Sequence, residues 1–236
     1  MLALIAGTFL IGQVLSIVVL ALLQPDLFQP DLFGSRLPML SRLLPVPTIL
    51  ASAAAEIPIF IAVLIGLPRA TRVSLRDLGF VRPNLRAIGI ALASVVAGVA
   101  LATVGSNVVS AVTHTGDHAQ ATEKMFLQMH VPWQIALFAV FAVVLGPIVE
   151  ETLFRAFAFN AVLRYGGFWT AAVVSSILFG LAHGDPFNAL PLALVGMVLC
   201  GVYYLTRNVV ASMIAHGAFN LLSLIALLFF PQMAGH

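Results

Sequence analysis

Three short stretches place ionisable side chains inside otherwise apolar runs of this 236-residue sequence. The richest runs from Gly146 to Arg155 and carries Glu150, Glu151 and Arg155 within six residues. A charged side chain at the centre of a membrane helix costs about 2.5–3.5 kcal/mol on insertion scales, so such groups need a reason. Glu151 and Arg155 are spaced i,i+4 and are expected to pair on one helix face. Glu150 lies about 100° further round the helix and is expected to point at a different partner.

Two later stretches add imidazole and amide groups. His183 follows Phe179 by four residues, and His216 and Asn220 are spaced i,i+4, so the last two project from one helix face. Taken singly, a histidine at a helix end is typical of a cap, and a buried polar pair is typical of a contact between helices. Taken together with Glu150, these groups fall on three predicted helices, which is how bundles build polar sites. Carboxylates and imidazoles are groups that move protons or bind metal ions.

The composition sets these groups in a membrane protein. The chain is 61% hydrophobic and 8% charged, with a mean hydropathy of +1.08, whereas soluble domains carry about 25% charged residues. Too little polar surface is left to keep such a chain in water. The formal net charge is +2, with no basic stripe and no nucleic-acid-binding motif, so nucleic acid is excluded as a partner. The single cysteine, Cys200, excludes an internal disulfide framework.

Long apolar helices must position the polar groups. A helix needs about 20 apolar residues to cross a bilayer, and seven stretches approach this length: 2–23, 48–67, 86–112, 134–163, 168–183, 187–206 and 208–230. We therefore predict an all-α, polytopic transmembrane helix bundle of about seven spans (six to eight), with the polar site between the C-terminal helices. Gly89, Ala93 and Ala97 form a small-residue stripe that predicts close packing of the third span.

The loop between the second and third spans bears on orientation. It holds the densest positive cluster of the chain: Arg69, Arg72, Arg76, Arg82 and Arg86. The positive-inside rule places this loop in the cytoplasm. With seven spans, the N-terminus is then cytoplasmic and the C-terminus lies outside.

A lone carboxylate, Glu56, lies about two turns into the second span and is followed by Pro58. Intramembrane acids usually face a cavity or a partner, so one hypothesis is that Glu56 lines a water-filled route to the polar site. The alternative is that its side chain extends to the nearby interface. The sequence leaves both interpretations open.

Read in order, the three motifs resemble a known family. Glu-Glu-x-x-x-Arg, Phe-x-x-x-His and His-x-x-x-Asn on successive apolar helices are similar to the CAAX-processing and bacteriocin-processing (CPBP) family of intramembrane proteases, the Abi or Rce1-like group. The segment 74–80 also resembles the one preceding that family's core, so the resemblance covers about 74–225. It implies N-terminal membrane anchor helices and loops over 1–73. An intramembrane protease core would then occupy 74–236, with its motifs at 150–155, 179–183 and 216–220.

The resemblance implies an intramembrane endopeptidase and gives each polar group a role. Peptide hydrolysis needs an activated water, a stabilised oxyanion and a proton for the leaving amine. Glu150 is the expected general base and His183 helps it to hold the water. His216 and Asn220 are the expected oxyanion donors.

A metal-dependent version uses the same side chains. Members of the family are commonly catalogued as metalloproteases, and Glu150, His183 and His216 would then hold a divalent ion such as zinc. Two histidines and one carboxylate are a known catalytic zinc set. A ligating Glu150 leaves the role of base to another group, such as Glu151, which is assigned with Arg155 to structural support. Both versions stay open.

Other intramembrane hydrolases fit less well. The sequence has no His-Glu-x-x-His and no Gly-x-Gly-Asp. Ser212 and His216 are spaced i,i+4 like a dyad, but the serine lacks a Gly-x-Ser-x-Gly setting. The alternative from another class is a non-enzymatic polytopic membrane protein, such as a binding scaffold, an immunity protein or a transporter, that uses the same polar cluster.

The resemblance also implies partners and a location. The expected partners are the lipid bilayer and a protein or peptide substrate, which some members of the family take in prenylated form. The expected location is the plasma membrane of a bacterium or archaeon, as a multi-pass protein.

Overall fold

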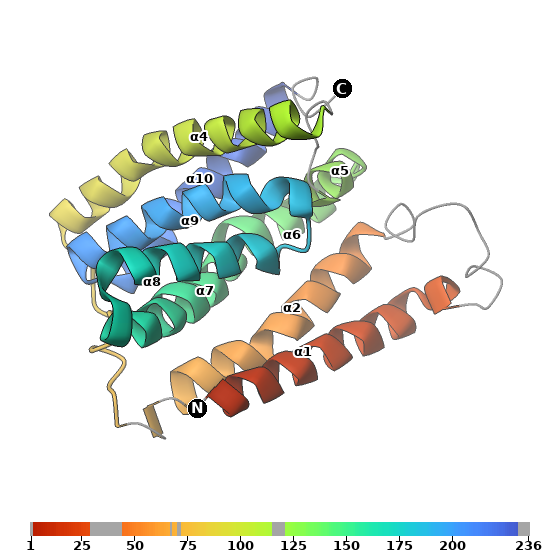
Figure 1. Ribbon diagram of the computed structural model, residues 1–236. Coiled ribbons are helices and arrows are strands. Elements are labelled where there is room, and N and C mark those ends of the chain that lie inside the picture. The colour runs from red at the N-terminus through yellow and green to blue at the C-terminus, as the bar shows by residue number, and fades with distance from the viewer. Residues whose placement is uncertain (1, 29–43, 67, 70–71, 115–120, 231–236) are drawn as a thin grey trace.

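The computed structural model describes residues 2–28, 44–66, 68–69, 72–114 and 121–230, and it contains no strand in these ranges. The helices are shown in Figure 1. In chain order they are α1 (Leu2–Leu23), η1 (Pro25–Phe28), α2 (Pro45–Ile61), η4 (Ala62–Gly66), α4 (Leu85–Thr113), α5 (Ala121–Leu127), α6 (Pro132–Val140), η5 (Phe141–Leu145), α7 (Gly146–Glu151), η6 (Thr152–Phe159), α8 (Asn160–Ala182), α9 (Pro186–Thr206) and α10 (Val209–Phe229). The elements η4, η5 and η6 are π-helices. The all-α prediction is confirmed.

Five of the described helices are long and apolar enough to cross a membrane: 45–66, 85–113, 132–182, 186–206 and 209–229. The third of these has 51 residues and includes two of the predicted spans, 134–163 and 168–183. It turns at Gly167, whose φ of 69° and ψ of −178° are open to glycine and closed to most other residues. Its last part, α8, packs against both η6 and α9. Residues 7–23 of α1 form an apolar helix that is too short by itself to count as a span, so the count of seven spans stays a prediction.

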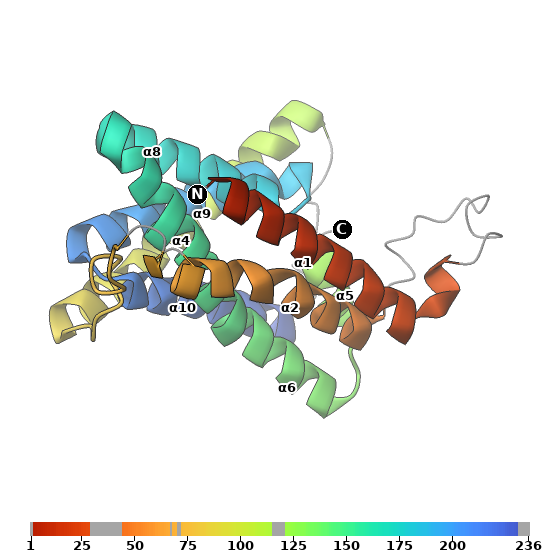
Figure 2. The ribbon, with the colours of Figure 1, turned by 90° about the horizontal axis from the view of Figure 1, so that it is seen from below.

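The helices form two groups. α1 and α2 run side by side in opposite directions, as both views show, and α1 makes most of its contacts with α2 and η1 (Figures 1 and 2). The second group holds α4 and α6 to α10, and α9 lies at its centre with contacts to α4, α8 and α10. Side-chain amides begin two of these helices. Asn84 caps α4 by accepting from the Ala87 N–H, and Asn208 caps α10 by accepting from the Ala211 N–H.

Small residues do mediate close packing of α4, but on the face opposite to the predicted one. Its buried positions are Ala87, Ala91, Gly98 and Gly105. A Cβ on Gly105 would lie 2.8 Å from the Cα of Pro191 in α9, whereas one on Gly89 would meet nothing within 4 Å. Ala93 and Ala97 are exposed. The prediction for the stripe 89–93–97 was therefore wrong.

The segment before α4 is tied to the junction between α9 and α10. Ser74 donates from its backbone N–H and its hydroxyl to Asp77, and these hydrogen bonds hold the pKa of the exposed Asp77 carboxyl below its usual value. Gly79 follows with a φ of 88°, and its carbonyl accepts from the Val209 N–H at 2.9 Å. The Tyr203 hydroxyl donates to the Leu78 carbonyl at 3.2 Å. These bonds anchor the N-terminal end of α10, the helix that carries His216 and Asn220.

Candidate active site

The helix that carries both glutamates is short and lies between two π-helices. α7 follows η5 and precedes η6, and π-helical turns shift backbone carbonyls out of the ordinary i,i+4 ladder. Two side chains from other helices bond carbonyls in these turns. Asn220 donates to the Ala142 carbonyl at 2.8 Å, and Ser175 donates to the Phe154 carbonyl at 2.9 Å. The π-turns are thus held by α10 and α8, and they are common at functional sites.

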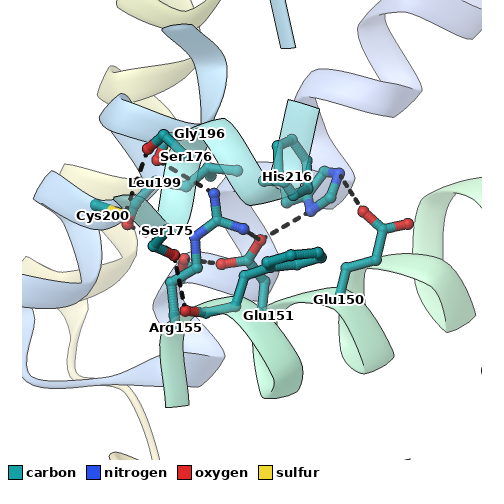
Figure 3. Close-up of polar contacts among 12 residues, drawn as sticks. Glu150, Glu151, Arg155, Ser175, Ser176, Gly196, Leu199, Cys200 and His216 are labelled. Atoms are coloured by element: carbon teal, nitrogen blue, oxygen red, sulfur yellow. Dashed lines mark hydrogen bonds and ion pairs between the residues drawn. The ribbon is translucent and has the colours of Figure 1, made fainter. Parts of the chain in front are cut away.

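Glu151 is the centre of a buried network. Its side chain and that of Arg155 are both 0% exposed, and Arg155 Nη1 lies 2.6 Å from Glu151 Oε1, which confirms the predicted pair. His216 Nδ1 lies 2.9 Å from the same oxygen. The Ser212 hydroxyl donates to the other carboxylate oxygen. A second Arg155 nitrogen donates to the Gly196 carbonyl of α9 at 3.1 Å. Together these contacts join η6, α7, α9 and α10, and Figure 3 shows those among Glu151, Arg155, Gly196 and His216.

Glu150 faces away from this network toward two histidines. Its Oε2 lies 3.9 Å from Nε2 of His183 and 3.9 Å from Nε2 of His216. Both separations are too long for a direct hydrogen bond, but they suit groups bridged by a water molecule. This oxygen is buried and has no hydrogen-bond partner within the described ranges. The Glu150 side chain is 23% exposed, in contrast to the sealed Glu151.

Each histidine is oriented through its other nitrogen. His183 follows the last residue of α8, and its Nδ1 lies 2.9 Å from the Phe179 carbonyl. Because that carbonyl can only accept, Nδ1 carries the proton and a neutral His183 presents the lone pair of Nε2 to Glu150. Nδ1 of His216 likewise faces a carboxylate, that of Glu151. The ring of Phe179 packs 4.9 Å from the His183 ring and 5.5 Å from the His216 ring, so it spaces the two.

The structure brings three of the four predicted catalytic side chains together. Glu150, His183 and His216 converge from α7, α8 and α10. Asn220 lies one turn along α10 from His216, with one amide N–H bound to Ala142. Within the described residues, no hydrogen bond or ion pair joins Asn220 to Glu150, His183 or His216. Its role as an oxyanion donor therefore stays a prediction. What the geometry does show is that Asn220 holds η5 in position through its hydrogen bond to Ala142.

Three supporting residues are not predicted from the sequence as part of the site. Ser212 had been considered only as half of a serine–histidine dyad, whereas its hydroxyl in fact bonds Glu151. Ser175 and Gly196 had no assigned role. The sequence signal for all three is a small residue in an apolar helix, and such residues are routine in membrane helices. Only the tertiary contact distinguishes them.

The donor types at Glu150, His183 and His216 suit zinc, and the Nδ1 partners of both histidines are of the kind that orient metal ligands. The spacing suits it less well. Zinc–nitrogen bonds of about 2.0–2.1 Å at tetrahedral angles place donors roughly 3.4 Å apart, whereas Glu150 Oε2 lies 3.9 Å from Nε2 of each histidine. Among the described residues no group of three or more His, Cys, Asp and Glu side chains is arranged to hold a metal ion. The three side chains would have to move closer together to ligate one.

Comparison with known proteins relates this region to membrane peptidases. Residues 132–222 match the family model described as type II CAAX prenyl endopeptidase Rce1-like. The chain is similar to the "Putative membrane peptidase YdiL" of Bacillus subtilis (strain 168), with 29% identity over 86 residues, 36% of this chain and 35% of the relative. It is also similar to the "Membrane-embedded CAAX protease MroQ" of Staphylococcus aureus (strain USA300), with 32% identity over 102 residues, 40% of each chain. The alignments thus span well under half of either relative. No solved structure matches the chain.

Proposed function

We propose, on the premise that residues 132–222 belong to the Rce1-like family of type II CAAX prenyl endopeptidases, that this protein hydrolyses peptide bonds of membrane-associated proteins or peptides. The observation that carries the proposal is the position of Glu150 Oε2, 3.9 Å from Nε2 of both His183 and His216. A carboxylate without a lysine or arginine partner, between two oriented imidazoles, is equipped to move a proton. The bacterial origin of the relatives favours the plasma membrane as its location.

The water is activated between Glu150 and His183. A water molecule that donates one hydrogen to Glu150 Oε2 and the other to His183 Nε2 directs an oxygen lone pair at the scissile carbonyl. Glu150 accepts a proton as the oxygen attacks, and it later delivers this proton to the leaving amine. The His183 tautomer, set by the Phe179 carbonyl, makes Nε2 an acceptor for the water.

The oxyanion is stabilised from α10. In its doubly protonated form, His216 donates through Nε2 while Nδ1–H stays on Glu151. Asn220 contributes the amide N–H that does not bond Ala142. Glu151, Arg155 and Ser212 take no part in the proton transfers. They hold His216 and the start of η6 in place through buried hydrogen bonds.

A bound zinc ion is the specific alternative for water activation, because three acceptor atoms face one another here. Glu150, His183 and His216 would be its ligands, and zinc lowers the pKa of bound water. Elemental analysis of active enzyme treated with a chelator separates the two versions. We expect activity without stoichiometric metal. One zinc per chain that is lost and regained together with activity would establish the metal version instead.

The function itself is tested in cells. Membrane proteomes of cells with the wild type and with Glu150→Gln are compared for new protein C-termini and released fragments. We expect a set of termini that appears only with the wild type. Identical termini in both strains would instead support a non-enzymatic role, such as a scaffold or transporter, for the same polar cluster.

A further inference from the structure

Glu56 is an acid that the proposed mechanism does not use, and its register on α2 turns it toward the site. It lies seven residues from both Ile49 and Val63, and positions seven apart share a helix face within about 20°. Ile49 is 3% exposed and belongs to the buried cluster that holds Phe138 of α6, while Val63 is 0% exposed and belongs to the cluster that holds Phe157 of η6. Glu56 therefore lies midway along the face of α2 that packs against the protein interior.

The element opposite this part of α2 is α7, which carries Glu150. α2 contacts α6, α7 and η6, so Glu56 and Glu150 lie on neighbouring helices. Glu56 is half-buried. Of the two interpretations that the sequence left open, the structure favours a carboxylate that faces the site over one that extends to the membrane interface.

No free lysine or arginine lies on the elements around the two facing carboxylates. The elements that pack most closely on α2 are α1, η4, α6, α7 and η6, and in their sequences the one basic residue is Arg155. The Arg155 guanidinium is already bound to Glu151 and to the Gly196 carbonyl. Over the described residues, no hydrogen bond or ion pair to Glu56 is found. A cation supplied by a substrate would complement this region.

We propose that Glu56 is a specificity-determining residue that binds a basic side chain of the substrate next to the scissile bond. This inference rests on the proposed peptidase function. A peptide at Glu150 would lie beside the inward face of α2, and a lysine or arginine in it would then meet the Glu56 carboxylate. A neutral residue leaves that carboxylate without a partner and an acidic one repels it, so discrimination would come from both attraction and repulsion.

The test uses a cleavage sequence found in the comparison of termini, with Lys, Gln or Glu placed in turn at each of three positions on either side of the cut bond. Purified full-length enzyme in liposomes is assayed for kcat/KM on each peptide. We expect the wild type to prefer Lys over Gln by about tenfold or more at one position. Glu56→Gln should bring this ratio close to one, because kcat/KM falls much more on the Lys peptide than on the Gln peptide. Glu56→Asp should retain a preference for Lys.

Glu123→Gln is the matched control, since it removes a carboxylate from α5, which carries none of the site residues, and should leave the ratio unchanged. An unchanged ratio in Glu56→Gln, or an equal loss on all peptides, would overturn the specificity role while leaving the peptidase function standing. Should Glu56→Gln fail to purify as a single species, Glu56→Lys tested for a reversed preference toward Glu peptides decides the question in its place. The absence of any cleavage by the wild type would overturn both proposals.

Discussion

Glu150 and Glu151 are neighbours on one short helix, yet their surroundings are opposite. Glu151 is sealed, with both oxygens bonded to three side chains from two other elements. Glu150 is partly exposed, and its Oε2 has no direct hydrogen-bond partner among the described groups. A buried charge whose partners are all in place resists change, whereas one that lacks a direct partner can take up or release a proton. The contrast assigns Glu151 to maintaining the site, and it is the basis for the proposal that Glu150 is the residue that acts in it.

The largest loss of stability should come from breaking the buried ion pair of Glu151 and Arg155. Arg155→Ala leaves the Glu151 carboxylate buried without its main partner, and we expect a loss of about 3–5 kcal/mol in unfolding free energy. Thermal unfolding and size-exclusion profiles in detergent measure it. The double variant Glu151→Leu with Arg155→Met removes both charges and should recover much of the loss. If Arg155→Ala unfolds like the wild type, the network does not hold the fold.

Asn220→Ala tests what α10 contributes to turnover. It removes an amide that bonds η5 and is the predicted oxyanion donor. We expect turnover to fall about 10²–10³-fold with KM nearly unchanged, the usual cost of losing one such donor. Asn220→Asp, which retains the size but presents no N–H donor, serves as the comparison. A fall in stability without a fall in turnover would assign Asn220 to positioning η5 alone.

Ser212→Ala tests a single hydrogen bond of the buried Glu151 network. The hydroxyl donates to the Glu151 carboxylate, and loss of a hydrogen bond to a charged group costs about 1.5–3 kcal/mol. Unfolding in denaturant measures the change. Activity measured at a temperature where the variant is folded should stay within a fewfold of the wild type. Complete loss of activity with the fold intact would revive a serine–histidine mechanism.

The smallest expected effect is a difference in stability between alanine substitutions at two glycines. Gly217→Ala would place a Cβ 2.5 Å from the Val143 carbonyl beside His216, whereas Gly89→Ala meets nothing within 4 Å. We expect Gly217→Ala to lower stability by about 1–3 kcal/mol through overpacking. Gly89→Ala should be neutral or slightly stabilising, since alanine is favoured over glycine in a helix by about 1 kcal/mol. Paired melting curves decide between them, and equal shifts would contradict the packing of α10 on η5.

The features that the sequence predicted correctly depend on local spacing. The i,i+4 pair of Glu151 and Arg155 formed as expected, because the helix alone brings both to one face. The all-helical fold follows from apolar length in the same way. The break in the predicted helices between 163 and 168 coincides with the turn at Gly167.

The features it missed depend on contacts between distant segments. The π-helices around α7 shift the backbone hydrogen bonds, and Asn220 and Ser175 bond carbonyls in these turns from other helices. Small residues occur on both faces of α4, so their spacing alone did not show which face is buried. The direction in which Glu56 points also required the packing of α2, because its own helix fits either interpretation.

The role of Glu150 as the base that activates the water is tested most directly by the rate of peptide cleavage. Purified Glu150→Gln in liposomes is measured beside the wild type and Glu123→Gln. We expect Glu150→Gln to remain monodisperse and to melt near the wild-type temperature, because no buried partner depends on Glu150. Its kcat should fall by at least about 10³-fold, because the base that activates the water is gone, while Glu123→Gln keeps full activity. Cleavage by well-folded Glu150→Gln at a rate close to the wild type would contradict the role of Glu150 as the base.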